Sequence, residues 1–405
     1  MRPDFLKGVR FTDLTWAGAG PFGTKVFSDF GAEVLKIESM TRPDSVRTAG
    51  PFKDGVVGTN RSGYFASRNT GKKSVALNLK TEEARRIVID LIAQSDVVTN
   101  NFGPGAMERL GLGYETLREI KPDLIYLSMP MYGQDGPRAN LLGVGMTISA
   151  VTSIMWHTAY GPNDPVGPGT HYPDHAANPY HGAFAVLAAL THRRKTGRGM
   201  KIDLSQVEST ANFVGPALVE TSATGEEIPQ VGNRSRTDAP HNIFAARGDD
   251  DWVAISVAGD AHWQALARAM NRADLLDDAA LASASGRLAA LERVEAAVAQ
   301  WTRERDAAET VAALRALGVP AAVVARSSEL VQHDPQLAAR GYWQHVQHPE
   351  VGPVLLSSPP FTIDGERVEL DRPPLFGEHT QQVLHDLLGM SAQDVAGLEA
   401  SGVLS

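Results

Sequence analysis

The sequence predicts an α/β fold, with a parallel sheet covered by helices and a smaller α/β unit. Strand and helix patterns alternate over residues 1–135, which is typical of a parallel sheet with helices on both faces. A polar, turn-rich segment at 222–240 then separates a second group of strand and helix patterns. The chain has 405 residues, whereas single cores stop growing near roughly 250–300, so two or three domains are expected.

The first half of the alternation is built from short apolar runs with helix signals between them. The runs predict strands at residues 9–14, 33–37, 74–79, 96–101 and 124–131. Pro21 suits the start of a helix, and Gly31 ends it. Thr81 is placed to cap a second helix that carries Glu82 and Glu83 in its first turn.

The later elements follow from the same signals. An alanine-rich pattern predicts a helix over 176–191, followed by the cations Arg193, Arg194 and Lys195, which suit the C-terminal end of a helix. Further elements are predicted as a strand at 201–204, a helix at 206–220, a strand at 252–257, helices across 261–316, a strand at 320–324 and a terminal helix at 379–388.

Composition excludes several kinds of chemistry. The chain has no cysteine, so disulfides, zinc–thiolate sites, iron–sulfur clusters and a cysteine nucleophile are excluded. A net charge of −9 argues against nonspecific nucleic-acid binding. No apolar run approaches the ~18 residues of a membrane span, and the first residues lack the pattern of a signal peptide, so a cytoplasmic protein without a membrane partner is expected.

The glycine pattern at residues 18–23 fits G-x-G-x-x-G after a strand and before a helix. With Glu38 at the end of the next strand, it resembles the dinucleotide-binding fingerprint. However, residues 15–17 lengthen the turn, and Pro21 removes one backbone donor. A nucleotide-dependent oxidoreductase therefore stays open as an alternative to a plain turn that starts a helix.

Residues 61–80 carry five cations and no acidic residue. These cations are Arg61, Arg68, Lys72, Lys73 and Lys80. The segment is either an anion-binding site or a solvated basic face.

Asp174 lies in a Pro-rich loop directly before the alanine-rich helix. It is either a capping carboxylate at the N-terminus of the helix or a carboxylate nucleophile whose charge helix amides tune. His171, His175 and His181 surround it in the sequence. Their spacing fits no standard zinc pattern, so we expect no metal.

Several ordered motifs resemble the family III CoA-transferases, a family that includes formyl-CoA, carnitine, bile-acid and benzylsuccinate CoA-transferases. The motifs are GAEVLKIE at 31–38, NTGKKSVALNLK at 69–80, NFGPGAMERLG at 101–111, YGQDGP at 132–137, RRKTGRG at 193–199 and PLFGEHT at 374–380. Together they span nearly the whole chain, which makes the resemblance specific.

The resemblance implies a CoA-transferase that moves CoA from an acyl-CoA donor, here succinyl-CoA, to a carboxylic acid acceptor. Asp174, which lies 23 positions before Gly197, matches the family's catalytic aspartate. It would pass through an aspartyl anhydride and an aspartyl-CoA thioester, with coenzyme A as substrate and no prosthetic group. Positions that match the family's CoA contacts are Gly18, Ala19, Leu77, Lys80, Asn101, Phe102 and Arg109.

The resemblance also implies an architecture. The large domain is expected to be Rossmann-like, with residues 1–221 forming its N-terminal part and 331–405 returning to it. Residues 222–330 are expected to hold the linker and the small domain. Family members form dimers interlocked like rings, so a homodimer is expected, or a heteromer with a homologous subunit in which this chain alone has little activity.

Three departures from the family pattern bear on specificity. Val144 and Gly145 replace the His-Asp pair of the racemases, which disfavours proton transfer at an α-carbon. The glycine loop of formyl-CoA transferase is missing, and residues 232–236 stand in its region. Ser39 replaces a CoA-contacting arginine, with Arg42 or Arg47 as substitutes. The stretch 167–181 looks closest to the benzylsuccinate branch, which implies an aromatic acceptor.

Overall fold

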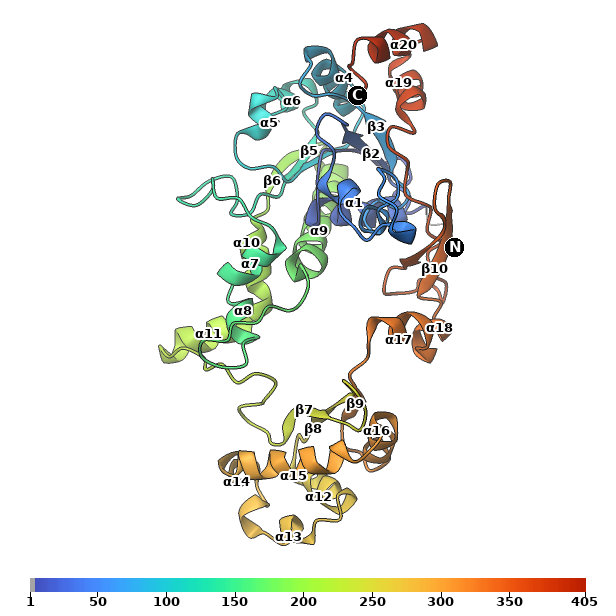
Figure 1. Cartoon of the computed structure of the whole chain (residues 1–405). Coiled ribbons are helices and arrows are strands. Elements are labelled where there is room, and N and C mark those ends of the chain that lie inside the picture. Colours follow the sequence, from blue (N-terminus) through green and yellow to red (C-terminus); the bar gives the residue numbers. More distant parts are fainter. Residues whose placement is uncertain (1–3) are drawn as a thin grey trace. The chain divides into compact units, whose positions relative to one another are not determined.

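The computed structural model describes residues 4–405 (Figure 1). The chain divides into two compact units. Of the described residues, the first unit contains 4–154, 168–219 and 335–405, and the second contains 155–167 and 220–334. The segment 155–167, which the sequence analysis assigns to the large domain, therefore packs with the second unit.

The first unit is built on a six-stranded sheet whose neighbouring strands all pair in parallel. Its strands are β1 (Arg10–Asp13), β2 (Glu33–Glu38), β3 (Lys73–Ala76), β4 (Val97–Asn100), β5 (Ile125–Ser128) and β6 (Met200–Asp203). Their spatial order, β3-β2-β1-β4-β5-β6, is that of a doubly wound Rossmann fold. The strand order reverses between β1 and β4, and ligands bind in such folds at this switch point, beyond the carboxyl ends of the strands.

Helices cover both faces of this sheet (Figure 1). On one face, α4 (Glu82–Ala93) and α6 (Tyr114–Ile120) bury Ile87, Leu91 and Leu117 against the sheet. On the other face, α1 (Ala19–Asp29) and α9 (Asn178–Thr196) bury Phe27 and Val186. The predicted α/β fold with a Rossmann-like parallel sheet is thus confirmed.

Short helices and the C-terminal segment complete the first unit. The short helices are α2 (Ser45–Thr48), α3 (Gly63–Ala66), α5 (Ala106–Arg109), α7 (Gly145–Val151), α10 (Gln206–Ala211) and α18 (Pro335–Ala339). The C-terminal segment forms the antiparallel pair β10 (Trp343–His348) and β11 (Gly352–Ser357), then α19 (Thr380–Leu388) and α20 (Ala392–Ala400). Val383 and Val395 of the last two helices pack into the same core as α4.

The second unit has its own antiparallel sheet and its own core. The sheet contains β7 (His241–Ala245), β8 (Trp252–Ser256) and β9 (Ala321–Val323). Its helices are α12 (Asp260–Ala269), α13 (Ala273–Leu276), α14 (Ala284–Ala289), α15 (Leu291–Arg303), α16 (Ala307–Ala316) and α17 (Ser327–Gln332). Trp263, Leu266 and Val298 are buried among them, so the second group of patterns forms a packed core.

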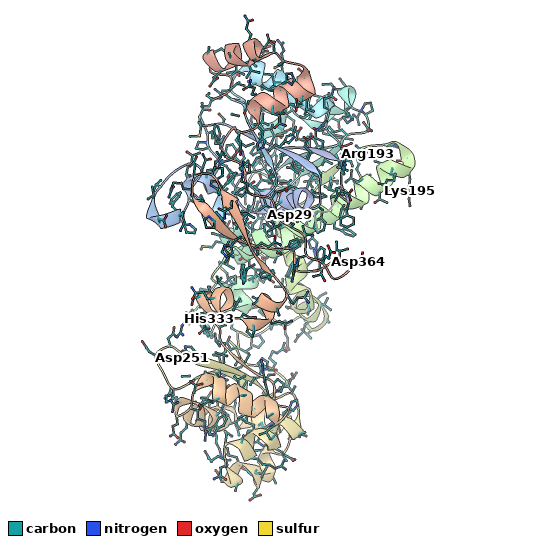
Figure 2. All side chains as sticks on the ribbon, turned by 90° about the vertical axis from the view of Figure 1, so that its right-hand side faces the viewer. Asp29, Arg193, Lys195, Asp251, His333 and Asp364 are labelled. Atoms are coloured by element: carbon teal, nitrogen blue, oxygen red, sulfur yellow. The ribbon has the colours of Figure 1, made fainter. Side chains whose placement is uncertain are left out.

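Two helices differ from their predicted bounds. The predicted helix at 206–220 is interrupted by a turn at 212–214, and α11 (Gly215–Thr224) follows it. Gly215 and Pro216 meet there, and proline has no N–H to continue the ladder. Helix α8 (Ile154–His157) was not expected. Helix α9 runs on to Thr196, so Arg193 and Lys195 lie in its last turn (Figure 2), where the negative end of the helix dipole favours cations.

Candidate active site

Asp174 occupies a π-helical turn (Pro173–Ala177) that runs directly into α9. Its backbone N–H donates to the carbonyl of His171 at 2.9 Å, and only 9% of the residue is exposed. Two glycines flank its carboxyl group. A Cβ atom on Gly18 would lie 2.6 Å from Oδ2 of Asp174, and one on Gly145 would lie 2.8 Å from the same atom. Any side chain at either position would therefore displace the carboxylate.

Burial and the neighbouring charges change the pKa of Asp174 in opposite directions. Burial raises the pKa of Asp174, while the charges of His171 and Arg68 and a hydrogen bond from the Gly145 N–H lower it. Arg68 is buried, stacks on Tyr64 with its Cζ 3.6 Å from the ring centroid, and donates to the ring of His175 at 2.9 Å. Burial first, then Arg68, lowers the pKa of His175 to about 4, so this ring is a neutral acceptor at neutral pH.

Asp174 faces a small cavity of about 90 Å³, here named the Asp174 chamber. Polar atoms make up more of its exposed wall than apolar atoms do, although its lining includes the apolar residues Pro130, Met131, Ala139, Leu141, Leu142 and Val144. Gly18 and Ala19, at the N-terminus of α1, form another part of the wall. Within residues 4–405, the N–H groups of these two residues donate to no other protein group, so both are free to bind a ligand.

A second cavity of about 1070 Å³, here named the cationic groove, lies beside the chamber. Four cations line it: Arg42, Lys80, Arg85 and Arg109. The only acidic residue in its described lining is Glu38, whose charge a bidentate ion pair with Arg47 neutralises. Six residues line both cavities, namely Ala17, Asn101, Gly103, Leu142, Gly143 and Val144. The groove and the chamber are therefore contiguous.

The loop after β1 borders both cavities, and hydrogen bonds from Asn101 and Asp44 hold it. Asn101, just after β4, accepts from the Trp16 N–H at 2.9 Å and donates to the Trp16 carbonyl at 2.8 Å. Asp44 accepts from the Ala17 N–H at 2.9 Å and pairs with buried Lys36 at the same distance. These contacts hold Ala17 at a φ of 61°, a conformation that non-glycine residues adopt only when their surroundings impose it.

The G-x-G-x-x-G pattern has a packing explanation. Gly18 admits Asp174, and a Cβ on Gly20 would lie 2.5 Å from the Thr15 side chain. A Cβ on Gly23 would lie 3.3 Å from the Pro179 carbonyl of α9. Each glycine thus permits a close approach within the protein, which explains the pattern without a bound dinucleotide.

The predicted CoA contacts divide between the two cavities. Leu77, Lys80, Phe102 and Arg109 line the cationic groove, Gly18 and Ala19 line the Asp174 chamber, and Asn101 lines both. Leu77 is fully buried, so it forms part of the groove wall rather than a flexible contact. The amide of Asn101 is bonded to Trp16, so its role is to hold the loop.

The basic segment 61–80 does not form one anion site. Lys72 is buried in an ion pair with Asp13 at 3.1 Å, and Lys73 pairs with Glu33 at 2.6 Å. Of its five cations, Lys80 is the one in the described lining of the groove. Sequence spacing could not show this, because strand β3 alternates its side chains between environments.

Arg42 and Arg47, the two candidates to replace the arginine missing at Ser39, lie in different surroundings. Arg47 is buried and bonded to Glu38, whereas Arg42 lines the cationic groove with its Cζ 4.9 Å from the Trp16 ring centroid. Sequence reasoning missed Arg85, which also lines the groove and donates to the carbonyls of Leu79 and Lys80. Its position on the first turns of α4, just after Lys80, was the available signal.

The three histidines near Asp174 do not converge. His175 contacts Arg68, and Nδ1 of His181 lies 2.7 Å from the Ser209 hydroxyl. Across residues 4–405, no three His, Asp or Glu side chains are grouped so that they could hold a metal ion. In the same range, no helix is both long enough and apolar enough to cross a bilayer.

Comparisons with known proteins agree over nearly the whole chain. The sequence model of CoA-transferase family III matches residues 6–380. Succinyl-CoA:mesaconate CoA-transferase of Haloarcula marismortui is 34% identical, with 94% of this chain and 96% of that protein covered. Formyl-CoA:oxalate CoA-transferase of Streptomyces avermitilis is 29% identical, with 98% and 99% covered. The crystal structure of a CaiB/BaiF family protein from Brucella suis superposes with a TM-score of 0.86 at 28% identity, covering 96% of this chain and 100% of that one.

Proposed function

This chain belongs to CoA-transferase family III and transfers CoA between carboxylic acids, and from that premise we propose that Asp174 is the covalent nucleophile. The observation that carries the proposal is its placement. Asp174 is the one acidic residue in the described lining of the chamber, and the chamber adjoins a groove with four cations. A nucleotide-dependent oxidoreductase receives no support, since packing accounts for the glycine pattern.

The reaction proceeds through two kinds of covalent intermediate. The Asp174 carboxylate attacks the thioester carbonyl of the donor, the C–S bond breaks, and a mixed anhydride and CoA thiolate form. The thiolate attacks the aspartyl carbonyl of the anhydride, which releases the donor acid and leaves an aspartyl-CoA thioester. The acceptor carboxylate then attacks this thioester, and the thiolate returns to the acceptor carbonyl and frees Asp174. Each step exchanges one acyl bond for another, so no net proton transfer is needed.

The N-terminus of α1 supplies the oxyanion stabilisation. Each addition to a carbonyl places negative charge on its oxygen, beside Asp174. The free N–H groups of Gly18 and Ala19 line the same chamber, and the positive end of the helix dipole adds to them. This assigns both residues to the reacting carbonyl, whereas the resemblance assigns them to CoA.

CoA lies in the cationic groove, with its thiol end at the chamber. Its phosphates carry several negative charges, and Arg42, Lys80, Arg85 and Arg109 provide the complementary charge in a protein whose net charge is −9. Arg42 takes the place of the arginine that Ser39 replaces, because Arg47 is bonded to Glu38.

Succinyl-CoA is the proposed donor. Support comes from the Haloarcula marismortui relative, whose name gives succinyl-CoA and mesaconate as its substrates. The benzylsuccinate-type resemblance at 167–181 adds an aromatic acid to the acceptors that need testing. A panel of aliphatic and aromatic acids therefore belongs in the assay.

The active form is proposed to be a homodimer of interlocked chains. Tyr180, Phe184 and Leu187 are exposed at i, i+4 and i+7 on α9, so they form one apolar face. Phe184 is 73% exposed, and an apolar face of this kind is typical of a surface that another chain covers. Activity of the purified chain by itself would exclude the alternative of a heteromer with a homologous subunit.

The decisive experiment replaces the nucleophile. Asp174→Asn should lower CoA exchange between succinyl-CoA and its best acceptor by at least ~1000-fold, while CoA still binds the groove. Hydroxylamine should trap Asp174 as a hydroxamate in the wild type incubated with succinyl-CoA, with the modified residue located by mass spectrometry. Exchange by Asp174→Asn at the wild-type rate would refute the covalent mechanism.

A further inference from the structure

We propose that the Asp174 chamber limits the transferred acyl group to short chains without a ring, and that Met131 and Leu142 set this limit. The inference rests on the proposed function, because the acyl group reaches the chamber only if Asp174 attacks the thioester. It goes beyond that function by naming the acceptor class and the residues that select it.

The volume of the chamber carries the argument. An apolar protein cavity of about 150 Å³ is known to hold one benzene molecule, and water occupies about 30 Å³ per molecule in the liquid. The Asp174 chamber has about 90 Å³. It is therefore smaller than a cavity that holds one benzene molecule, which favours short acyl groups. A phenyl ring attached to the acyl chain exceeds this space and would have to extend into the contiguous groove proposed for CoA, which disfavours the aromatic acceptor implied by the benzylsuccinate-type resemblance.

Packing around Gly143 holds the Met131 wall of the chamber in place. A Cβ on Gly143 would lie 2.5 Å from Sδ of Met131, so Met131 is pressed against the backbone of the loop. Met131 is itself only 8% exposed. A Cβ on Gly103 would lie 3.1 Å from Cδ2 of Leu142, the residue that lines both the groove and the chamber. Met131 thus forms a packed part of the wall, whereas Leu142, which is 79% exposed, borders the passage between the two cavities.

The chamber is expected to select acyl groups by size, because its side chains offer no cation that could bind a second charged group of the substrate. Its described lining contains no lysine, arginine or histidine. The amide of Gln206 donates to the Met129 carbonyl at 2.7 Å and accepts from Asn178 at 3.1 Å, and the amide of Asn101 is bonded to Trp16. Each of these amides uses one of its two N–H groups in this way, so the donors left for a substrate are uncharged N–H groups, among them those of Gly18 and Ala19.

The test compares acceptors that differ in bulk, with succinyl-CoA as the donor. Acetate, propionate and butyrate are compared with phenylacetate and benzylsuccinate in the full-length wild-type protein. We expect kcat/KM for the phenyl acids to be at least ~100-fold below that for propionate. Met131→Ala removes three heavy atoms from the wall, and Leu142→Ala widens the passage. Each should raise the ratio of phenylacetate to propionate kcat/KM at least ~10-fold.

Met129→Ala is the matched control. Met129 is buried like Met131 and lies two positions away, but it does not line the chamber. Its substitution should leave the ratio of phenylacetate to propionate kcat/KM unchanged. This result would distinguish an effect of chamber size from an effect of a loosened core. If the wild type were as active with phenyl acids as with propionate, the size limit would be wrong. The proposed function would still stand in that case, provided that Asp174→Asn abolishes transfer. An unchanged ratio in both Met131→Ala and Leu142→Ala would overturn the size limit too, and transfer to no acid at all would overturn the proposed function with it.

Discussion

At the scale of single residues, the site depends on glycines, which have no side chain, as much as on Asp174 itself. Gly18 and Gly145 admit the Asp174 carboxylate because neither carries a Cβ atom. Gly145 stands where the racemases of the family have an acidic residue. An acidic side chain there would collide with Asp174 and with His171, so this chain's geometry favours a nucleophile over an acid/base pair.

Gly18→Ala should therefore inactivate the protein without unfolding it. The added methyl would lie 2.6 Å from the Asp174 carboxyl oxygen and force it to move, and a displacement of about 1 Å can cost about 100-fold in rate. Steady-state kinetics and thermal unfolding check both halves of this expectation. Gly215→Ala is the control, because its Cβ meets nothing within 4 Å and it lies in a helix. Equal activity of the two variants would contradict the prediction.

The pH at which kcat falls on the acidic side should depend on the groups around Asp174. Only the ionised carboxylate attacks, and burial raises the pKa of Asp174, so kcat should fall as pH drops through a value above the usual ~3.9. The titratable groups that act on it are His171, Arg68 and the Tyr64 ring stacked on Arg68.

Removing the charge of Arg68 should change the pH at which kcat falls on the acidic side. Arg68→Met removes a cation that favours ionised Asp174, so this fall should shift to higher pH by about one unit. Arg68→Lys keeps the charge and should shift it less. Arg61→Met, in the same segment but bonded to backbone carbonyls, serves as the control. Superimposable profiles for Arg68→Met and wild type would rule out this electrostatic role.

At the scale of elements, the sequence signals that succeeded are local ones. The capping role predicted for Thr81 is confirmed, since its hydroxyl accepts from the Ala84 N–H. The break at Gly215 and Pro216 was missed, although both residues were visible, because the apolar pattern continues across it.

Thr81→Ala should lower the free energy of unfolding by about 1 kcal/mol through loss of this cap. Because Thr81 itself lines neither cavity, kcat at saturating acyl-CoA should not change, although α4 also carries Arg85 of the cationic groove. Denaturant unfolding followed by circular dichroism measures the difference. Thr191→Ala is the comparison, since its hydroxyl bonds only back to the Leu187 carbonyl within α9. A loss for Thr191→Ala as large as for Thr81→Ala would mean that capping is not the cause.

At the scale of the whole molecule, the apolar face of α9 yields a prediction about assembly. Phe184→Glu places a charge in the centre of the proposed dimer contact and should convert dimer to monomer in analytical ultracentrifugation. Ile120→Glu is the control, because Ile120 is also exposed and apolar but lies on α6, across the sheet. If both variants stay dimeric, the α9 face is not the contact.

The sequence by itself determined the fold class, the family and the candidacy of Asp174, because strand and helix periods and motif spacing are properties of neighbouring residues. Only the tertiary structure decided what lies around Asp174. Gly18 follows β1, Asn101 follows β4 and Gly145 begins α7, and they meet because the sheet places β1 beside β4 and brings their carboxyl ends to one edge. The same long-range packing buried Lys72 against Asp13 and left Lys80 in the groove. Charge counted along a chain says which residues are basic, but burial in three dimensions decides which of them can meet a ligand.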